Sequence, residues 1–198
     1  MALPVARFAA AVRARNPLIH SITNYVVAPF QANALSALGA SPIMADEPEE
    51  AAKLTGLSDG LVVNIGTLNQ HSINAMYLSA QAACRKNIPR VLDPVGVGAS
   101  YLRQHTVHEL LQLFRFSAIR GNAGEIAFLA QAGHRNKGID AGALEADPLQ
   151  IAQTVARRYQ SIVVMTGAED YITDGHTTYL CRNGHPMMSA ITGTGCQL

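Results

Sequence analysis

Short runs of β-branched and aliphatic residues recur along this chain and are separated by helical segments of ten or more residues. The clearest runs are LVVNIG, RVLDP, SAIR and SIVVMTG, which begin at Leu61, Arg90, Ser117 and Ser161. Such runs suit strands that are buried on both faces of a parallel sheet. Because strands that alternate with helices form right-handed βαβ units, we expect a doubly wound α/β fold with a mostly parallel sheet flanked by helices.

The remaining elements follow from periodicity and from end signals. Asn24 can cap a helix over 26–38 and Gly39 can close it. The segment 171–180 contains Asp174-Gly175 between two apolar runs, which predicts an antiparallel hairpin. A strand is expected at 18–21, a further helix begins at Asn122, a loop insertion covers 133–147, and other helices are expected at 3–15, 47–56, 72–86, 101–114 and 148–159.

Length and charge narrow the classes of function. The 198 residues suit one domain, here 1–198. A net charge of +1 without a basic block makes nucleic acid an unexpected partner. Three cysteines without C-x-x-C spacing favour a reducing compartment, so we expect a cytoplasmic protein. The arginines within the first apolar stretch exclude a signal peptide there, and we expect no membrane span.

Polar or glycine-containing clusters fall at the end of four predicted strands. They are Gly66-Thr67, Asp93-Pro94, Arg120-Gly121-Asn122 and Thr166-Gly167. Open α/β sheets bind ligands at the carboxyl ends of their strands. We therefore expect one shared active site at this edge, although each cluster taken singly also fits an ordinary connection.

The segment ITGTGCQL at 191–198 is expected to form an anion hole. Gly193 and Gly195 flank Thr194 and offer successive backbone N–H groups at what should be a helix N-terminus. Taken alone, an ordinary turn explains these glycines equally well. The chain has neither a G-x-G-x-x-G nor a G-x-x-x-x-G-K-[ST] motif, which counts against a dinucleotide-binding domain and against a P-loop nucleotidase.

Several segments together resemble the hydroxyethylthiazole kinases of the ribokinase-like superfamily, across essentially the whole chain. They are PLIHSITNYVV with Ala32-Asn33, ALGASPIMADEPEEA, NIGTL, VLDPVGVGAS, AIRGNAGEIAFLA, TGAEDYITDG and TGTGC, in the family's order. The pairing of IRGN-x-x-E with GTGC discriminates, because related sugar kinases end in a GAGD-type turn whose aspartate is the base. Cys196 stands at that position here.

The resemblance implies a kinase that uses MgATP to phosphorylate the hydroxyl of 4-methyl-5-(2-hydroxyethyl)thiazole in thiamine biosynthesis. It places ATP at Arg120, Asn122, Thr166 and Gly167, and Mg²⁺ at Asp93 and Glu125. It places the thiazole alcohol at Asn24, Met44, Gly66, Thr67 and Gly193. Since family members resemble homotrimers with interfacial sites, Met44 would arrive from a neighbouring subunit.

Simple chemistry agrees with these roles. Hard Mg²⁺ prefers carboxylate oxygens and retained waters, so Asp93 and Glu125 suit it as outer partners. Asn122 can also cap the helix that follows while Glu125 completes the capping box, and both readings can hold together. The guanidinium of Arg120 is a donor fork that suits phosphate, the alternative being a surface salt bridge.

Cys196 is the candidate for activating the substrate hydroxyl. A thiol at a helix N-terminus beside phosphate and Mg²⁺ can ionise near neutral pH, and the thiolate would accept the alcohol proton. Phosphoryl transfer depends more on positioning and charge neutralisation than on a strong base, so we expect Cys196 to assist rather than dominate.

Other notable residues have plainer expected roles. His105 and His108 lack a third metal ligand nearby and are expected to be solvated. His20 fits either a pocket wall or a hydrogen-bonded core, and His176 belongs to the hairpin turn. The remaining expectations are buried small side chains at Cys84 and Cys181, and core or wall positions at Met187 and Met188.

The resemblance further implies that the family continues after GTGC with helices that cover one face of the sheet. This predicts that the final helices are missing here, and that the 198-residue chain alone is inactive or poorly soluble.

Three other functions compete with the thiazole kinase. Another ribokinase-like enzyme, such as a hydroxymethylpyrimidine kinase or a nucleotide-dependent hydrate dehydratase, is disfavoured by SITN, Met44 and the cysteine of GTGC. A non-catalytic, truncated binding protein stays open, because the chain keeps most ligand-facing residues. An NAD-dependent oxidoreductase fits the α/β pattern but lacks the glycine fingerprint.

Overall fold

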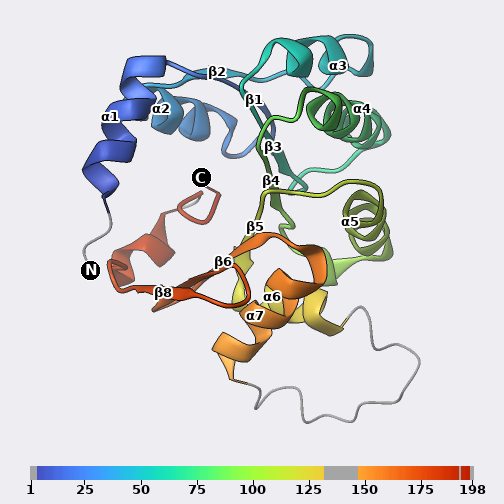
Figure 1. Ribbon diagram of the computed structural model, residues 1–198. Helices are drawn as coiled ribbons and strands as arrows, with labels where there is room; N and C mark the ends of the chain where they lie inside the picture. The colour runs from blue at the N-terminus through green and yellow to red at the C-terminus, as the bar shows by residue number, and fades with distance from the viewer. Residues whose placement is uncertain (1–3, 132–146, 192, 197–198) are drawn as a thin grey trace. The chain divides into compact units, whose positions relative to one another are not determined.

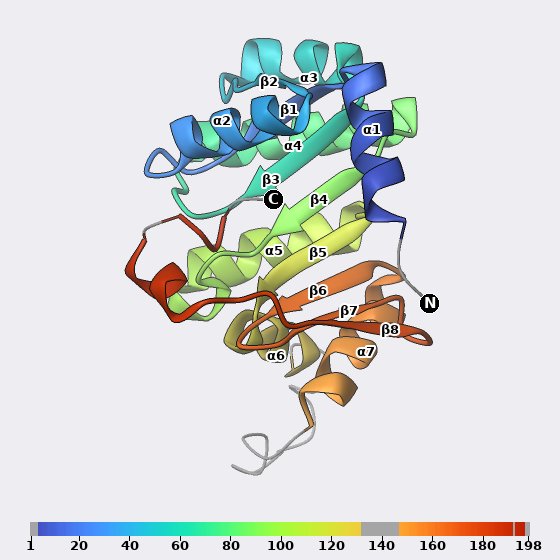
Figure 2. The same ribbon diagram turned by 90° about the vertical axis from the view of Figure 1, so that its left-hand side faces the viewer.

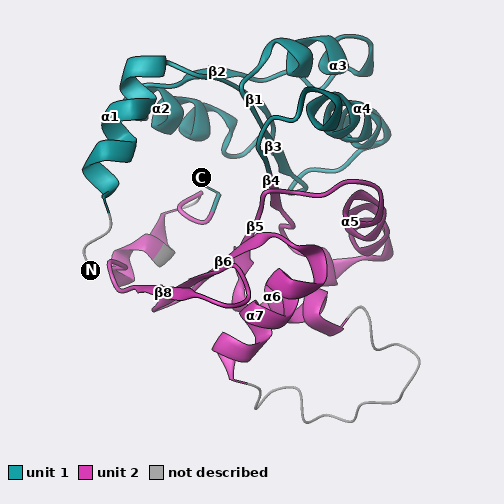
Figure 3. Ribbon diagram, in the orientation of Figure 1, with its two compact units in different colours: residues 1–90, 196–198 teal, residues 91–195 magenta. Residues whose placement is uncertain are grey.

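A computed structural model describes residues 4–131, 147–191 and 193–196 of the chain. These residues form two compact units (Figure 3): residues 1–90 with 196–198, and residues 91–195. The expectation of a single domain over 1–198 stays a prediction.

The first unit is a three-stranded parallel sheet with helices on both faces. The strands are β1 (Leu18–Ile22), β2 (Ser41–Ile43) and β3 (Gly60–Asn64), and β1 pairs with both neighbours. In Figure 1, α1 (Val5–Arg15) and α2 (Ala28–Leu38) lie on one face of these strands, and α3 (Pro48–Leu57) and α4 (Gln70–Lys86) lie on the other. Every residue of β3 is buried, as the apolar run predicts.

Local end signals set the helix boundaries of this unit. Gly39 ends α2 with a φ of 95° and donates its N–H to the carbonyls of Leu35 and Ser36, a left-handed cap that suits glycine. The N-cap of α2 is Val27, so the prediction that Asn24 caps this helix is wrong. Asn24 instead accepts from the Val27 N–H with its side chain, within the turn that precedes the helix.

The second unit is a mixed sheet. Its parallel part comprises β4 (Arg90–Asp93, all but its first residue), β5 (Ala118–Asn122) and β6 (Ile162–Thr166). The predicted hairpin is confirmed, because β7 (Asp170–Thr173) pairs antiparallel with both β6 and β8 (Thr178–Cys181). Figure 2 shows β4, β5 and β6 running in the same direction.

Helices α5 (Tyr101–Leu113), α6 (Ala123–Gln131) and α7 (Pro148–Tyr159) pack on one face of this sheet (Figure 1), and short 3₁₀ turns occupy η1 (Val97–Ala99) and η3 (Pro186–Ala190). Phe116, Ile119, Ile126 and Val163 are fully buried between the layers. The predicted α/β class with a mostly parallel sheet is confirmed. The predicted loop over 133–147 lies outside the described residues, except Asp147, which caps α7.

Among the described residues, no helix has both the length and the apolar character needed to cross a bilayer.

Candidate functional site

The carboxyl ends of three parallel strands bring predicted site residues to one edge of the second unit. Asp93 ends β4, Asn122 ends β5 and Thr166 ends β6, with Asn122 directly opposite Thr166 in the register. Because β4 and β6 both pair parallel with β5, the three residues share an edge. The sequence prediction that these clusters meet is confirmed for this unit.

Asp93 and Arg120 form a buried charged pair at this edge. Arg120 Nη1 lies 3.9 Å from Asp93 Oδ2, and the side chains of Arg120 and Asp93 are 10% and 2% exposed. This separation is a charge contact and not a hydrogen bond. Arg120 Nε is buried and has no hydrogen-bond partner among the described residues, so the guanidinium keeps a donor that an anion could use. The alternative of a surface salt bridge is wrong, since both groups are buried.

Glu125 ties two segments of this edge together. Its Oε2 accepts from the Asn122 N–H at 2.8 Å, while Asn122 Oδ1 accepts from the Glu125 N–H at 3.0 Å. This confirms the predicted capping box at the start of α6. Its other oxygen, Oε1, accepts from the Gly96 N–H at 2.8 Å, a contact that the sequence did not predict. Glu125 therefore fixes the loop after β4 against the start of α6.

A cavity of about 850 Å³ adjoins this edge. The predicted nucleotide residues Arg120, Asn122, Thr166 and Gly167 all line it. Its volume lies within the usual range for small-molecule sites. The rest of the lining includes Thr194 and Gly195 from the predicted anion-hole segment and Met188 from a predicted core or wall position. The other lining residues were not assigned to a site by sequence reasoning, namely Ala168, Asp170, Asn183, Gly184, His185 and Pro186.

Two hydrogen bonds made by lining residues shape the cavity. Asp170 Oδ1 accepts from the Gly167 N–H at 3.0 Å and closes the turn after β6. Thr194 donates its hydroxyl to the Met188 carbonyl at 2.8 Å, which holds the GTG segment against η3. A polar side chain three residues after Gly167 was a signal for the first contact. Met187 is 66% exposed, so the prediction of a core or wall position is wrong for it, whereas Met188 lines the wall.

In the first unit, Asn24 lies at the centre of a buried polar network. Its Nδ2 donates to Asn64 Oδ1 at 3.0 Å and faces the sulfur of Cys196 at 3.7 Å. Its Oδ1 accepts from the Val27 N–H at 3.2 Å. With 6% of the residue exposed, both ends of the amide serve contacts inside the protein.

Gly66 completes this network because no larger residue fits. Its N–H donates to Asn64 Oδ1 at 2.9 Å. A Cβ at this position would lie 2.8 Å from both Cβ and Nδ2 of Asn24, closer than carbon atoms approach without displacement. Thr67 follows at the end of the same strand connection and is half-buried. Asn24, Gly66 and Cys196 are thus brought together, as three of the predicted site residues.

Met44 lies just after β2 and lines a small cavity of about 120 Å³ in the first unit. Tyr25 and Asp46 lie on the same cavity, and the Tyr25 hydroxyl donates to Asp46 Oδ2 at 2.9 Å. This hydrogen bond and the nearby negative charge raise the pKa of the Tyr25 phenol. The other lining residues are Ser21, Ile22, Thr23, Ala28 and Ala45.

The remaining candidates have structural positions. His20 is fully buried, with Nδ1 2.7 Å from the Thr55 hydroxyl and Nε2 2.8 Å from the Ala45 carbonyl. It is therefore the hydrogen-bonded core residue of the two alternatives. His105 and His108 are exposed as predicted, and His176 lies in the hairpin turn. Cys84 and Cys181 are half-buried, so the prediction of buried small side chains is wrong.

The GTGC segment is described from Gly193 to Cys196. Gly193 has a φ of 93°, a left-handed conformation that suits glycine, and residues 193–195 form a turn. The expected anion hole at a helix N-terminus stays a prediction.

The described residues contain no group of three or more His, Cys, Asp or Glu side chains placed to hold a metal ion. Two carboxylates are nevertheless compatible with Mg²⁺, which usually keeps several waters and takes further oxygens from substrate phosphates. Asp93 offers a buried carboxylate beside Arg120. Glu125 already accepts two backbone hydrogen bonds, so its contribution would be through the loop or through water.

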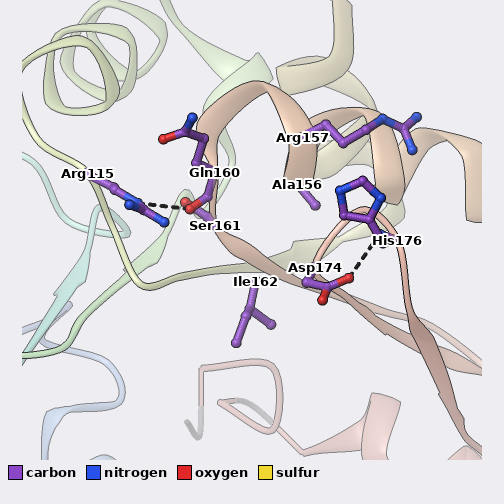
Figure 4. A pocket seen from close by; sticks show the side chains of 8 residues that line it. All are labelled: Arg115, Ala156, Arg157, Gln160, Ser161, Ile162, Asp174 and His176. Atoms are coloured by element: carbon purple, nitrogen blue, oxygen red, sulfur yellow. Dashed lines mark hydrogen bonds between the residues drawn. The ribbon is translucent and has the colours of Figure 1, made fainter.

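A second hollow in the same unit has a different character (Figure 4). It has a volume of about 650 Å³ and lies at the amino end of β6, next to Ile162. Arg115 donates to the Gln160 carbonyl at 3.0 Å, and Arg157 donates to the Gly175 carbonyl at 2.8 Å. Asp174 accepts from the His176 and Thr177 N–H groups, which lowers the pKa of its carboxyl. These groups stabilise turns, so the carboxyl edge remains the candidate site.

Comparison with known proteins is consistent with this geometry. A model of the hydroxyethylthiazole kinase family matches residues 9–198. The chain is 50% identical over 187 residues to a hydroxyethylthiazole kinase of Pasteurella multocida, covering 94% of this chain and 70% of the relative. A hydroxyethylthiazole kinase of Methanosarcina mazei is 47% identical, with 93% and 71% covered.

Solved structures show the same fold. The hydroxyethylthiazole kinase protein from Pyrococcus horikoshii OT3 matches with a TM-score of 0.86 and 40% identity, covering 96% of this chain and 71% of that one. An adenosine kinase of Anopheles gambiae matches with a TM-score of 0.57 and 10% identity, covering 90% and 65%. At that identity the likeness concerns the fold alone, which is ribokinase-like.

Proposed function

This chain belongs to the hydroxyethylthiazole kinase family and is a phosphotransferase with an alcohol acceptor, and we propose how its residues share the reaction. The reaction transfers the γ-phosphoryl group of ATP to the hydroxyl of 4-methyl-5-(2-hydroxyethyl)thiazole, a step of thiamine biosynthesis. The observation that carries the residue assignment is that four predicted nucleotide residues line one cavity at a strand edge.

The cavity of the second unit is the proposed ATP site. Arg120 directs a buried guanidinium with an unfilled donor at this edge, which suits a phosphate oxygen. Asn122, Thr166 and Gly167 line the same space and offer amide, hydroxyl and backbone groups. Gly167 has no side chain, so at this position only backbone atoms line the cavity.

Asp93 is the proposed carboxylate partner of Mg²⁺, and Glu125 supports it from the neighbouring loop. When bound, Mg²⁺ would neutralise charge on the transferring phosphate. Asp93 also holds the Arg120 guanidinium in place through its charge. Glu125 keeps the loop after β4 at a fixed distance from the start of α6 through the Gly96 and Asn122 N–H groups.

The thiazole alcohol is proposed to bind near Asn24, Gly66, Thr67 and Gly193. The close packing of Asn24 against Gly66 supports a preformed polar surface at the end of β1 and β3. Met44 is proposed to reach the substrate from a neighbouring subunit of a homotrimer. This assignment is supported by its half-buried position at the end of β2, beside a small cavity.

Cys196 is proposed to take the proton of the substrate hydroxyl as the oxygen attacks the γ-phosphorus. The P–O bond to ADP breaks as the new P–O bond forms, and the thiol carries the proton afterwards. An N–H donor that faces the sulfur, as Asn24 Nδ2 does, favours the ionised form of a thiol. A loose transition state needs little help from a base, so this role is an assisting one.

A pyrimidine-type kinase is not favoured by a specific observation. A phosphomethylpyrimidine kinase of Clostridium difficile matches with a TM-score of 0.57 and 11% identity, which shows the fold alone. We also propose a cytoplasmic location, because three cysteines without C-x-x-C spacing suit a reducing compartment.

The product identifies the acceptor. We define the extended chain as this chain joined to the C-terminal helices that the family resemblance implies, taken from the Pasteurella multocida relative, of which the match covers 70%. The extended chain is incubated with MgATP and hydroxyethylthiazole, and the products are separated and identified by mass spectrometry. A phosphate ester of the thiazole alcohol is expected. Hydrolysis of ATP without this ester would contradict the proposal.

A further inference from the structure

A buried glutamine that the reaction scheme does not use joins the start of α2 to Cys196. Gln31 is 1% exposed, and its Nε2 donates to the Cys196 backbone carbonyl at 3.2 Å. Its Oε1 accepts from the Ser21 hydroxyl at 2.7 Å. All three residues belong to the first unit.

The orientation of this amide is determined by its partners. A backbone carbonyl only accepts hydrogen bonds, so the nitrogen of the Gln31 amide must face Cys196. The oxygen then faces Ser21, whose hydroxyl can donate. A flipped amide would place the Gln31 oxygen against the Cys196 carbonyl oxygen. Only one orientation of the amide therefore keeps both hydrogen bonds.

The base of the bridge is rigid. Gln31 lies in the first turns of α2, where its own N–H donates to the Val27 carbonyl at 2.8 Å and Pro29 restricts the backbone. Ser21 lies within β1 and is also buried. Two regular elements therefore hold the Gln31 side chain from both ends.

The same segment reaches Cys196 at a second point. Asn24, seven residues before Gln31, faces the Cys196 sulfur with Nδ2 at 3.7 Å. The segment 24–31 thus contacts both the side chain and the backbone carbonyl of Cys196. Fixing the backbone limits where the thiol can point, because the sulfur moves with its own Cα and one rotatable bond.

We propose that Gln31 is a positioning residue that holds Cys196 so that its thiol faces Asn24. Its importance for turnover rests on the proposed function, in which Cys196 takes the substrate proton. The positioning itself is independent of turnover, because it concerns one hydrogen bond and the setting of one thiol.

The test measures alkylation of each cysteine by iodoacetamide as a function of pH, with peptides resolved by mass spectrometry. Cys84 and Cys181 serve as internal references, since both are half-buried thiols on α4 and β8, elements that do not form this bridge. Gln31→Met keeps the length of the side chain and removes both hydrogen bonds. Ser21→Ala removes the bond to Ser21 alone and is the matched control.

In Gln31→Met, alkylation of Cys196 is expected to rise by about three- to tenfold with an altered pH profile, the size expected for one lost hydrogen bond. Cys84 and Cys181 keep their rates, and Ser21→Ala changes Cys196 less. An unchanged Cys196 profile in a folded variant would overturn the proposal. An equal rise at all three cysteines would overturn it as well, because Gln31 would then serve overall stability.

A second variant covers the case in which Gln31→Met does not fold. Gln31→Glu keeps an acceptor for Ser21 but places an acceptor opposite the Cys196 carbonyl, so Cys196 should again alkylate faster. In the extended chain, the same variant should lower kcat while KM for ATP is kept, and an unaltered kcat would count against the proposal. If the unsubstituted extended chain shows no turnover, the proposed function fails, and alkylation alone still decides the role of Gln31.

Discussion

Asn24 Nδ2 lies 3.0 Å from Asn64 Oδ1, so one hydrogen bond between two amides joins the ends of the paired strands β1 and β3. Asn64 Oδ1 also accepts from the Gly66 N–H at 2.9 Å. The side-chain amide of Asn24 and the backbone N–H of Gly66 therefore both donate to the same buried oxygen of Asn64. A buried network of this kind is stable only when its members keep their places.

Gly66→Ala should disturb this network. The new Cβ would lie 2.8 Å from Asn24, so Asn24 or the backbone must shift. We expect a loss of about 1 to 3 kcal/mol in the free energy of unfolding, measured by urea denaturation. Gly56→Ala is the control, because a Cβ there meets no atom within 4 Å and α3 gains helix propensity. Equal effects at both glycines would contradict the close-packing explanation.

Glu125→Gln should loosen the loop after β4. A glutamine has one acceptor oxygen, so the Gly96 and Asn122 N–H groups cannot both keep their partner. The free energy of unfolding should fall by about 1 to 3 kcal/mol. Glu109→Gln, at a half-exposed side chain on α5, should change it by less than about 0.5 kcal/mol. If the two variants unfold at the same denaturant concentration, the bridging role of Glu125 is wrong.

Substitution of Cys196 should cost less rate than substitution of Asp93. Cys196→Ala removes an assisting base, whereas Asp93→Ala removes a charged group at the proposed metal and leaves the Arg120 guanidinium buried without its partner. The measurement is kcat of both variants in the extended chain, with folding verified by circular dichroism. A loss for Cys196→Ala that equals or exceeds the loss for Asp93→Ala would refute this ranking.

His20 should make stability depend on pH. Burial lowers its pKa below the ordinary value of 6.5, partly opposed by the bond to Ala45 and the charge of Glu50. Below pH 6.5 the unfolded chain therefore binds a proton that the folded chain does not, so this contribution to stability is full above 6.5 and decreases as the pH falls. Urea denaturation at a series of pH values should show the decrease, and His20→Asn should weaken it. If the free energy of unfolding instead rose on acidification, and did so only when His20 is present, the predicted direction of the pH dependence would be wrong.

Much of the fold could be predicted from the sequence because local signals agree with it. The buried run of β3, the left-handed Gly39 after α2, and the box between Asn122 and Glu125 each depend on residues a few positions apart. The strand ends then place Asp93 and Thr166 at one edge through the topology of parallel strands. The placement of these two residues could therefore be predicted without knowing any side-chain contact.

The parts that were missed depend on distant contacts. Gln31 meets Cys196 across 165 residues of sequence, and Glu125 meets Gly96 across 29. No periodicity in the sequence reports either pairing. Met187 was expected inside because it is apolar, but its place in the short turn η3 leaves it exposed.

The most direct test of the kinase assignment is a coupled ADP-release assay with MgATP, run on this chain and on the extended chain. Hydroxyethylthiazole and hydroxymethylpyrimidine are compared as acceptors at equal concentration. We predict that the extended chain releases ADP in proportion to hydroxyethylthiazole and releases far less ADP with the pyrimidine. A folded extended chain that releases no thiazole-dependent ADP, or that prefers the pyrimidine, would contradict it.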